Sequence, residues 1–174
     1  MCVDQAVAPA RNGHSTEAIP TNGTHPPRPG AALERFVYNT TRSPEFVDIT
    51  DDVRAALQRS GMAHGFAVVF SRHTTAAIRI NEAEPLLLQD MEAMLARIAP
   101  AGVYYRHNDP AWSDCDRHNA DSHLRSTMLG ISLALQIADG DVVLGEWQSV
   151  IMAEFDGPRD RSIRLQAMGI ASEK

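Results

Sequence analysis

The C-terminal part of the chain consists of short apolar segments separated by tight turns. The segments cover residues 131–137, 142–144, 147–155 and 162–168. Asp139-Gly140 follows the first of them, and Asp156-Gly157-Pro158 precedes the last. Asp-Gly and Gly-Pro sequences are typical of turns, and short turns join neighbouring antiparallel strands. This part of the chain is therefore expected to form a largely antiparallel sheet.

Four further strands are predicted nearer the N-terminus. Alternating or β-branched apolar residues mark residues 33–40, 46–49, 65–71 and 76–80. Only Arg72 and the polar break His73-Thr74-Thr75 lie between the last two strands. We therefore expect those two strands to be neighbours, with a polar site between them.

Three helices are predicted from start and stop signals. They cover residues 50–60, 85–99 and 119–128. Thr50 and Asn119 are predicted N-caps, and Pro85 opens the second helix. The second helix has apolar residues at helical spacing, which predicts a core-facing side: Leu87, Met91, Met94, Leu95 and Ile98.

Strands outnumber helices, and the two do not alternate as a doubly wound or barrel protein requires. The predicted fold class is α+β, with largely antiparallel, β-sandwich-like sheets and about three helices. Residues 31–174 are expected to form a single domain. Residues 1–30, rich in Ala, Pro, Gly, Thr and Asn, are expected to be a disordered tail that includes His14 and His25.

Composition restricts the classes of function. The chain has 174 residues, 44% of them hydrophobic, which is enough for one core. Its formal net charge of -6 argues against a nucleic-acid partner, since that affinity rests on Lys and Arg. No apolar run approaches a membrane span, and two cysteines make no disulfide framework. We expect a cytoplasmic protein whose partner is a small molecule.

Three polar segments lie where predicted strands or helices begin or end. Residues 107–123, HNDPAWSDCDRHNADSH, contain three histidines and four aspartates. The other two segments are 71–75 and 154–159. We expect the three segments to converge on one site.

His73 has two readings on the sequence alone. A lone histidine at a strand end is commonly satisfied by the backbone, but Thr74 and Thr75 add hydroxyls that can donate to a phosphate. Asn81 and Glu82 also follow a strand. Glu82 has the chemistry of a general base, a metal ligand or a group that orients a ligand histidine, and otherwise that of a helix-entry carboxylate.

The turn after the seventh predicted strand carries Arg159 and Arg161. Either guanidinium can bind a substrate phosphate through its planar fork. The alternative is turn chemistry with surface ion pairs, which are worth little energetically. The sequence leaves these two interpretations equally open.

The ordered motifs from Gly65 to Gly169 resemble those of the YjbQ-like family, also called the secondary thiamine-phosphate synthase family. The matching motifs are His73-Thr74-Thr75, Asn81-Glu82, Asp90-Met91-Glu92, His107-Asn108, Asn119-Ala120-Asp121-Ser122-His123-Leu124, Met128-Leu129-Gly130, Asp139-Gly140, Leu144-Gly145-Glu146-Trp147-Gln148 and Glu154-Phe155-Asp156-Gly157-Pro158-Arg159. Two departures are Glu146, where members usually have Thr, and the residues 112–117 between the histidine motifs.

The resemblance implies a β-sandwich-like subunit that assembles as a homotrimer. It also implies weak thiamine-phosphate synthase activity, in which hydroxymethylpyrimidine pyrophosphate joins thiazole phosphate and pyrophosphate is released. Two alternatives are a non-catalytic trimer that binds a metal or a phosphometabolite, and a metal-dependent phosphate-ester hydrolase.

The resemblance makes His73, His107 and His123 candidate ligands of a divalent metal, zinc or magnesium. His118 is not expected to take part in the site. The chain has no HxH or HExxH sequence, so spacing alone does not support this site. The predicted catalytic residues are His73, Glu82 and His123. The predicted substrate-binding residues are Thr74, Thr75, Asn81 and Arg159.

Overall fold

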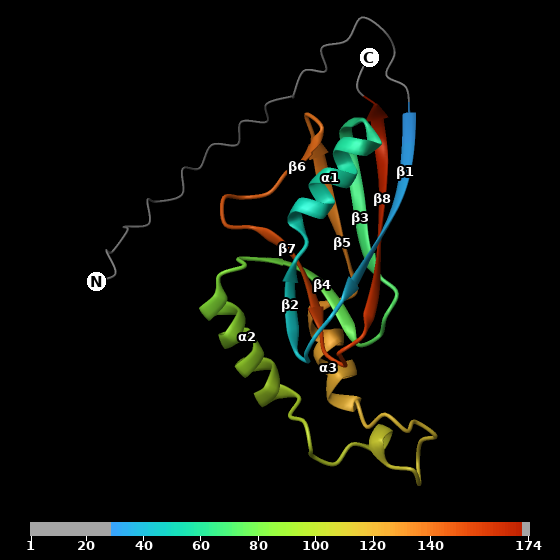
Figure 1. Cartoon of the computed structure of the whole chain (residues 1–174), viewed down its shortest axis with the longest axis vertical. Helices are drawn as coiled ribbons and strands as arrows, with labels where there is room; N and C mark the ends of the chain where they lie inside the picture. Colours follow the sequence, from blue (N-terminus) through green and yellow to red (C-terminus); the bar gives the residue numbers. More distant parts are fainter. Residues whose placement is uncertain (1–28, 172–174) are drawn as a thin grey trace, which may run out of the picture.

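The computed structural model describes residues 29–171, which form two antiparallel sheets and three α-helices (Figure 1). In chain order the elements are β1 (Pro29–Asn39), β2 (Glu45–Asp48), α1 (Thr50–Ser60), β3 (Met62–Ser71), β4 (Ala76–Asn81), α2 (Pro85–Ile98), the 3₁₀ turn η1 (Arg106–Asn108), α3 (Ala120–Leu129), β5 (Ser132–Ala138), β6 (Asp141–Val142), β7 (Ser149–Glu154) and β8 (Asp160–Ala171). The predicted α+β class is confirmed.

The five-stranded sheet has the order β1-β8-β3-β5-β6, and the three-stranded sheet has the order β2-β7-β4. The prediction that β3 and β4 are neighbours was wrong, because they belong to different sheets. β3 pairs with β5 and β8, whereas β4 pairs with β7. The polar residues between β3 and β4 carry the chain from one sheet to the other, so this turn lies at the junction of the two sheets.

The main core lies between the two sheets. Apolar side chains of the five-stranded sheet pack there against α1 and against Ile78, Val150 and Met152 of the three-stranded sheet. A second, smaller cluster on the three-stranded sheet contains Ala77 and Phe155, and Leu129 of α3 packs against it. The five-stranded sheet, the three-stranded sheet and α3 therefore follow one another as layers.

The start of α1 differs from the prediction in one detail. Thr50 is the first helical residue, and Ile49 occupies the N-cap position without a side-chain cap. Asp48 Oδ1 accepts hydrogen bonds from the Thr50 backbone N–H at 2.9 Å and from its hydroxyl. The hydroxyl in turn accepts the Val150 N–H at 2.8 Å, so Thr50 ties the helix start to β7.

Helix α2 begins at the predicted residue, and Glu84 caps it by accepting the N–H groups of Leu86 and Leu87. Its predicted core-facing side is only partly buried. Leu95 alone among its residues is buried, while Met94 is 38% exposed and Ile98 is 55% exposed. In Figure 1 the helix lies at the margin of the molecule, and its apolar residues Met94 and Ile98 are open to solvent.

Apolar side chains are also exposed on the outer face of the five-stranded sheet. They are Leu33 and Val37 of β1, Phe66 and Phe70 of β3, and Met168 of β8. We call this set the outer apolar face. The uncovered α2 surface and the outer apolar face are two separate regions that a single chain leaves open to solvent.

Strand β1 starts at Pro29, just before the predicted domain boundary at residue 31. The rest of the predicted tail, residues 1–28, lies outside the described residues. Among residues 29–171, no helix is long and apolar enough to cross a membrane.

Candidate functional site

A buried ion pair joins the end of β7 to the start of β8 at the junction of the two sheets. Glu154 is 0% exposed, and Arg161 is 1% exposed. The Arg161 guanidinium donates to both Glu154 oxygens and, at 2.9 Å, to the hydroxyl of Thr75. Glu154 also accepts the Asp156 N–H at 2.6 Å. Full hydrogen bonding offsets the cost of burying both charges.

His73 lies beside this ion pair and bonds to β8. The Ser162 backbone N–H donates to His73 Nε2 at 2.9 Å, so the neutral ring carries its proton on Nδ1. Burial lowers the pKa of His73, and Arg161 lowers it further against the opposing effect of Glu154. The imidazole is therefore neutral at pH 7 and has only its Nδ1–H left to offer.

His107 and His123 form a second group, which we call the histidine pair. Their rings meet edge to face with centroids 5.0 Å apart. Burial lowers the pKa of His123, with a further contribution from His107, and Asp156 opposes the shift. Residues on η1 and on the first turn of α3 are thus brought together, and His123 is neutral at pH 7.

Asp156 is the centre of a polar group at the same end of the molecule, which we call the Asp156 cluster. Its carboxylate bonds to Asn119 Nδ2 at 2.8 Å and pairs with Arg159 at 3.2 Å and with Arg117 at 3.3 Å. Two guanidinium groups share one carboxylate, which leaves an excess of positive charge. Within residues 29–171, Arg159 Nε is one of two buried side-chain polar atoms that have no hydrogen-bond partner.

Asn81 and Glu82 lie away from these groups, at the far end of β4. A strand rises about 3.4 Å per residue, so roughly 20 Å of chain separates Thr75 from Glu82. Asn81 Oδ1 accepts the Glu82 N–H at 2.9 Å, and its Nδ2 contacts the Met91 sulfur of α2. Within one chain Glu82 is not placed to act on a group held by His73.

Segments 71–75 and 107–123 both meet segment 154–159, but at different residues. His73 and Thr75 lie at the Glu154–Arg161 pair, Thr74 is exposed in the turn, and His123 lies near Asp156. Sequence reasoning missed Arg117, which is in the unusual 112–117 segment, and assigned Asn119 to helix capping. The Asn119 side chain bonds to Asp156 instead of capping α3.

A metal held by His73, His107 and His123 together stays a prediction. Among the described residues, no three His, Cys, Asp or Glu side chains are grouped so as to hold a metal ion. The histidine pair supplies two imidazole rings, a type of ligand that zinc binds through a ring nitrogen. His73 would join them through Nε2 only if that nitrogen gave up the Ser162 N–H.

The His73 bond predicts a dependence of stability on pH. Since the folded pKa is below the unfolded value of about 6.5, stability is complete above that pH and is lost as pH falls. Protonated Nε2 cannot accept the Ser162 N–H, which costs about 1 kcal/mol. Denaturant unfolding at pH 7.5 and pH 5 should therefore show a larger drop for the natural chain than for His73→Gln, whose amide oxygen stays an acceptor.

His118→Gln is the matched control, because His118 is an exposed histidine. It should keep the pH dependence of the natural chain. Equal pH dependence in His73→Gln and the natural chain would show that the bond to Ser162 is not what protonation disrupts.

The fold and the site define a small two-sheet α+β protein with a positively charged cluster beside neutral histidines. A family model described as UPF0047 protein YjbQ-like matches residues 34–170. The chain belongs to this family, which confirms the resemblance seen in its motifs.

Relatives from several organisms support the assignment. A UPF0047 protein of Methanothermobacter thermautotrophicus is 45% identical over 78% of this chain and 91% of its own length. The UPF0047 protein YugU of Bacillus subtilis is 36% identical over 79% of this chain and 99% of its own. A crystal structure of a Sulfolobus solfataricus protein, described as YbjQ-like and of unknown function, aligns with a TM-score of 0.76 at 31% identity. That alignment covers 82% of this chain and 99% of the Sulfolobus chain.

Proposed function

We propose that this protein is a transferase of the thiamine-phosphate synthase type that acts on small phosphorylated heterocycles. It would join hydroxymethylpyrimidine pyrophosphate to thiazole phosphate and release pyrophosphate. The observation that supports this most directly is the Asp156 cluster, where Arg117 and Arg159 share one carboxylate next to the histidine pair. Such a cluster has the charge and the N–H donors that a pyrophosphate group requires.

In the proposed reaction, the bond between the pyrimidine methylene carbon and the pyrophosphate oxygen breaks, and its electrons leave with pyrophosphate. Positive charge develops on the methylene carbon, and the thiazole nitrogen forms the new C–N bond with its lone pair. Arg159 and Arg117 would stabilise the charge on the departing group, since fixed donors act most strongly where charge develops. No proton has to leave carbon, so a neutral His123 suits hydrogen bonding to the leaving group.

A divalent ion belongs to the proposal as well. The histidine pair would hold an ion such as zinc, whereas magnesium prefers oxygen ligands and would arrive with the pyrophosphate. Either ion would supply further charge stabilisation for the leaving group.

The test is formation of thiamine phosphate from the two phosphorylated substrates by the purified protein. His123→Ala removes one ring of the histidine pair and should reduce product formation to a small fraction of that of the natural chain. Phosphate-ester substrates assayed in parallel would reveal a hydrolase instead. If the natural chain formed no more thiamine phosphate than His123→Ala does, the transferase proposal would be rejected.

A second candidate function is binding without turnover. It is favoured by the separation of Glu82 from His73 along β4, which leaves the predicted catalytic residues apart within one chain. Calorimetric titration with pyrophosphate separates the two functions. Tight binding without product favours the binding protein, and no binding at all argues against both.

We also propose that the chain assembles as a homotrimer, as the resemblance implies. The outer apolar face supports self-association, because exposed apolar patches of this kind commonly mark interfaces. Phe66, 49% exposed at the centre of β3, is the residue chosen to test it.

In light scattering coupled to size exclusion, the natural chain should have three times the 19.0 kDa mass of one chain. Phe66→Lys should elute as a monomer, since a charge buried at an interface without a partner is costly. Gln58→Lys adds the same charge on the exposed side of α1 and should remain trimeric. A monomeric natural chain, or a trimeric Phe66→Lys variant, would contradict the proposal.

A further inference from the structure

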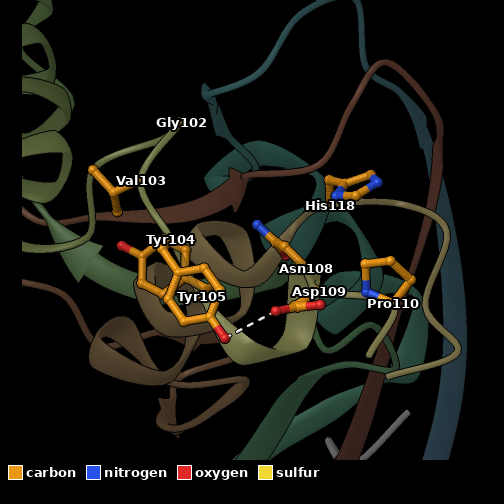
Figure 2. A pocket seen from close by; sticks show the side chains of 8 residues that line it. All are labelled: Gly102, Val103, Tyr104, Tyr105, Asn108, Asp109, Pro110 and His118. Carbon is orange, nitrogen blue, oxygen red and sulfur yellow. Dashed lines mark hydrogen bonds between the residues drawn. The ribbon is translucent and has the colours of Figure 1, made fainter. Parts of the chain in front are cut away.

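A hollow of about 490 Å³ lies beside η1, outside the Asp156 cluster. It is lined by residues 102–105, 108–110 and His118 (Figure 2). Ligand pockets commonly measure roughly 300–1,000 Å³, so the hollow has room for one aromatic ring and its substituents. Figure 2 shows the rings of Tyr104 and Tyr105 on one side, and Asn108, Asp109, Pro110 and His118 on the other.

The two tyrosine rings are held by hydrogen bonds at their tips. The Tyr104 hydroxyl donates to Asp109 Oδ2 at 2.9 Å, and the Tyr105 hydroxyl donates to the Pro100 carbonyl at 3.0 Å. Tyr104 nevertheless has 69% of its surface exposed. A large ring that is fixed in orientation and still open to solvent offers a preformed surface on which another planar ring can stack.

The polar groups of the hollow select against anions. Asp109 lines it, and neither Lys nor Arg is among the described residues that do. Asp109 Oδ1 also accepts the Ala111 N–H at 2.9 Å, which fixes the carboxylate. Asn108 Oδ1 accepts the Ala120 N–H at 3.0 Å, so the group that Asn108 can offer a ligand is its NH₂. An amine-bearing, uncharged or cationic ring suits this set, and a phosphate does not.

The hollow and the positively charged cluster share two segments of chain. Asn108 follows His107 of the histidine pair, and His118 lies between Arg117 and Asn119, which both contact Asp156. A substrate with a ring at one end and a pyrophosphate at the other could therefore place its ring in the hollow and its pyrophosphate at the Asp156 cluster.

We propose that this hollow, which we call the tyrosine hollow, binds the aminopyrimidine ring of the substrate by stacking on Tyr104, with the ring amine donating to Asp109. The identity of the ring as part of the substrate rests on the proposed function. Ring binding itself does not, because it needs neither the phosphates nor turnover.

Calorimetric titration with two separate probes tests the proposal: the phosphate-free 4-amino-5-hydroxymethyl-2-methylpyrimidine, and inorganic pyrophosphate. Tyr104→Leu should weaken binding of the aminopyrimidine about tenfold, the scale of one aromatic stacking contact. Tyr104→Phe keeps the ring and should bind within about threefold of the natural chain. Both variants should bind pyrophosphate as the natural chain does, which also shows that they are folded.

Arg159→Ala should give the opposite pattern, with weaker pyrophosphate binding and unchanged aminopyrimidine binding. The proposal is overturned if the aminopyrimidine fails to bind the natural chain, or binds Tyr104→Leu as tightly. If the aminopyrimidine binds through Tyr104 while no thiamine phosphate forms, the tyrosine hollow stands and the proposed reaction falls. If thiamine phosphate forms while binding of the aminopyrimidine does not depend on Tyr104, the proposed reaction stands and the tyrosine hollow is rejected as the ring site.

Discussion

Replacing Glu154 with glutamine is expected to lower the free energy of unfolding by about 3–5 kcal/mol, the usual cost of leaving a buried charge without its partner. Arg161 is 1% exposed and would keep its positive charge, because a guanidinium does not deprotonate in proteins. The Thr75 hydroxyl and the amide oxygen of the new glutamine would remain as hydrogen-bond acceptors, but neither carries the compensating negative charge. Denaturant unfolding monitored by circular dichroism measures the loss.

Two controls distinguish the buried ion pair from a general effect of losing a carboxylate. Glu92→Gln removes the partner of Arg42 on the surface and should cost at most about 1 kcal/mol. The double variant Glu154→Leu with Arg161→Met removes both charges and should recover much of the stability lost in Glu154→Gln. A loss in Glu154→Gln no larger than in Glu92→Gln would show that Arg161 finds other partners.

Replacing Arg159 with alanine is expected to lower the rate of thiamine phosphate formation by about 10²-fold to 10³-fold, as removal of one fixed donor to a developing negative charge commonly does. The Arg159 side chain is 28% exposed and pairs with Asp156 through Nη1 at 3.2 Å, so the other N–H groups at the end of its guanidinium can donate to a ligand. The rate should be measured at saturating concentrations of both substrates, since the effect concerns the leaving group.

Arg159→Lys and Arg59→Ala are the matched controls for this rate. Arg159→Lys keeps the charge but loses the planar fork, so its rate should lie between those of the natural chain and Arg159→Ala. Arg59, which pairs with Glu34 on the surface at α1, should be replaceable without effect on the rate. An unchanged rate in Arg159→Ala would remove Arg159 from the site.

The sequence predicted most of the elements because their signals are local. Pro85 and Gly61 mark helix ends wherever the chain folds, and the alternation of apolar residues predicts strands without knowledge of their partners. Strand partners are different, because they depend on contacts between distant residues. The short turn after Ser71 suggested a hairpin, but β3 buries both of its edges against β5 and β8, so β4 pairs with β7 in the other sheet.

The candidate site was predictable as a set of segments and not as a set of contacts. Segment 154–159 was expected to meet the other two, and it does so through Glu154 and Asp156. The bond from Ser162 to His73 joins residues 89 positions apart, and no spacing rule indicates it. Helix α2 contributes only Leu95 to the core, for a related reason. Its apolar spacing shows that a face is to be covered, but not whether the cover comes from the same chain.

The Glu154–Arg161 pair has a consequence for finding the natural ligand. Glu154 ends a strand of one sheet and Arg161 belongs to a strand of the other, so the ion pair links the two sheets. Asp156 and Arg159 lie in the loop between these two strands, whose ends the ion pair holds together. A ligand held by that loop binds the folded protein and not the unfolded chain, and so raises the melting temperature by an amount that grows with the logarithm of its concentration relative to its Kd. Melting curves recorded against a panel of metabolites would therefore reveal the ligand without any assumption about the reaction.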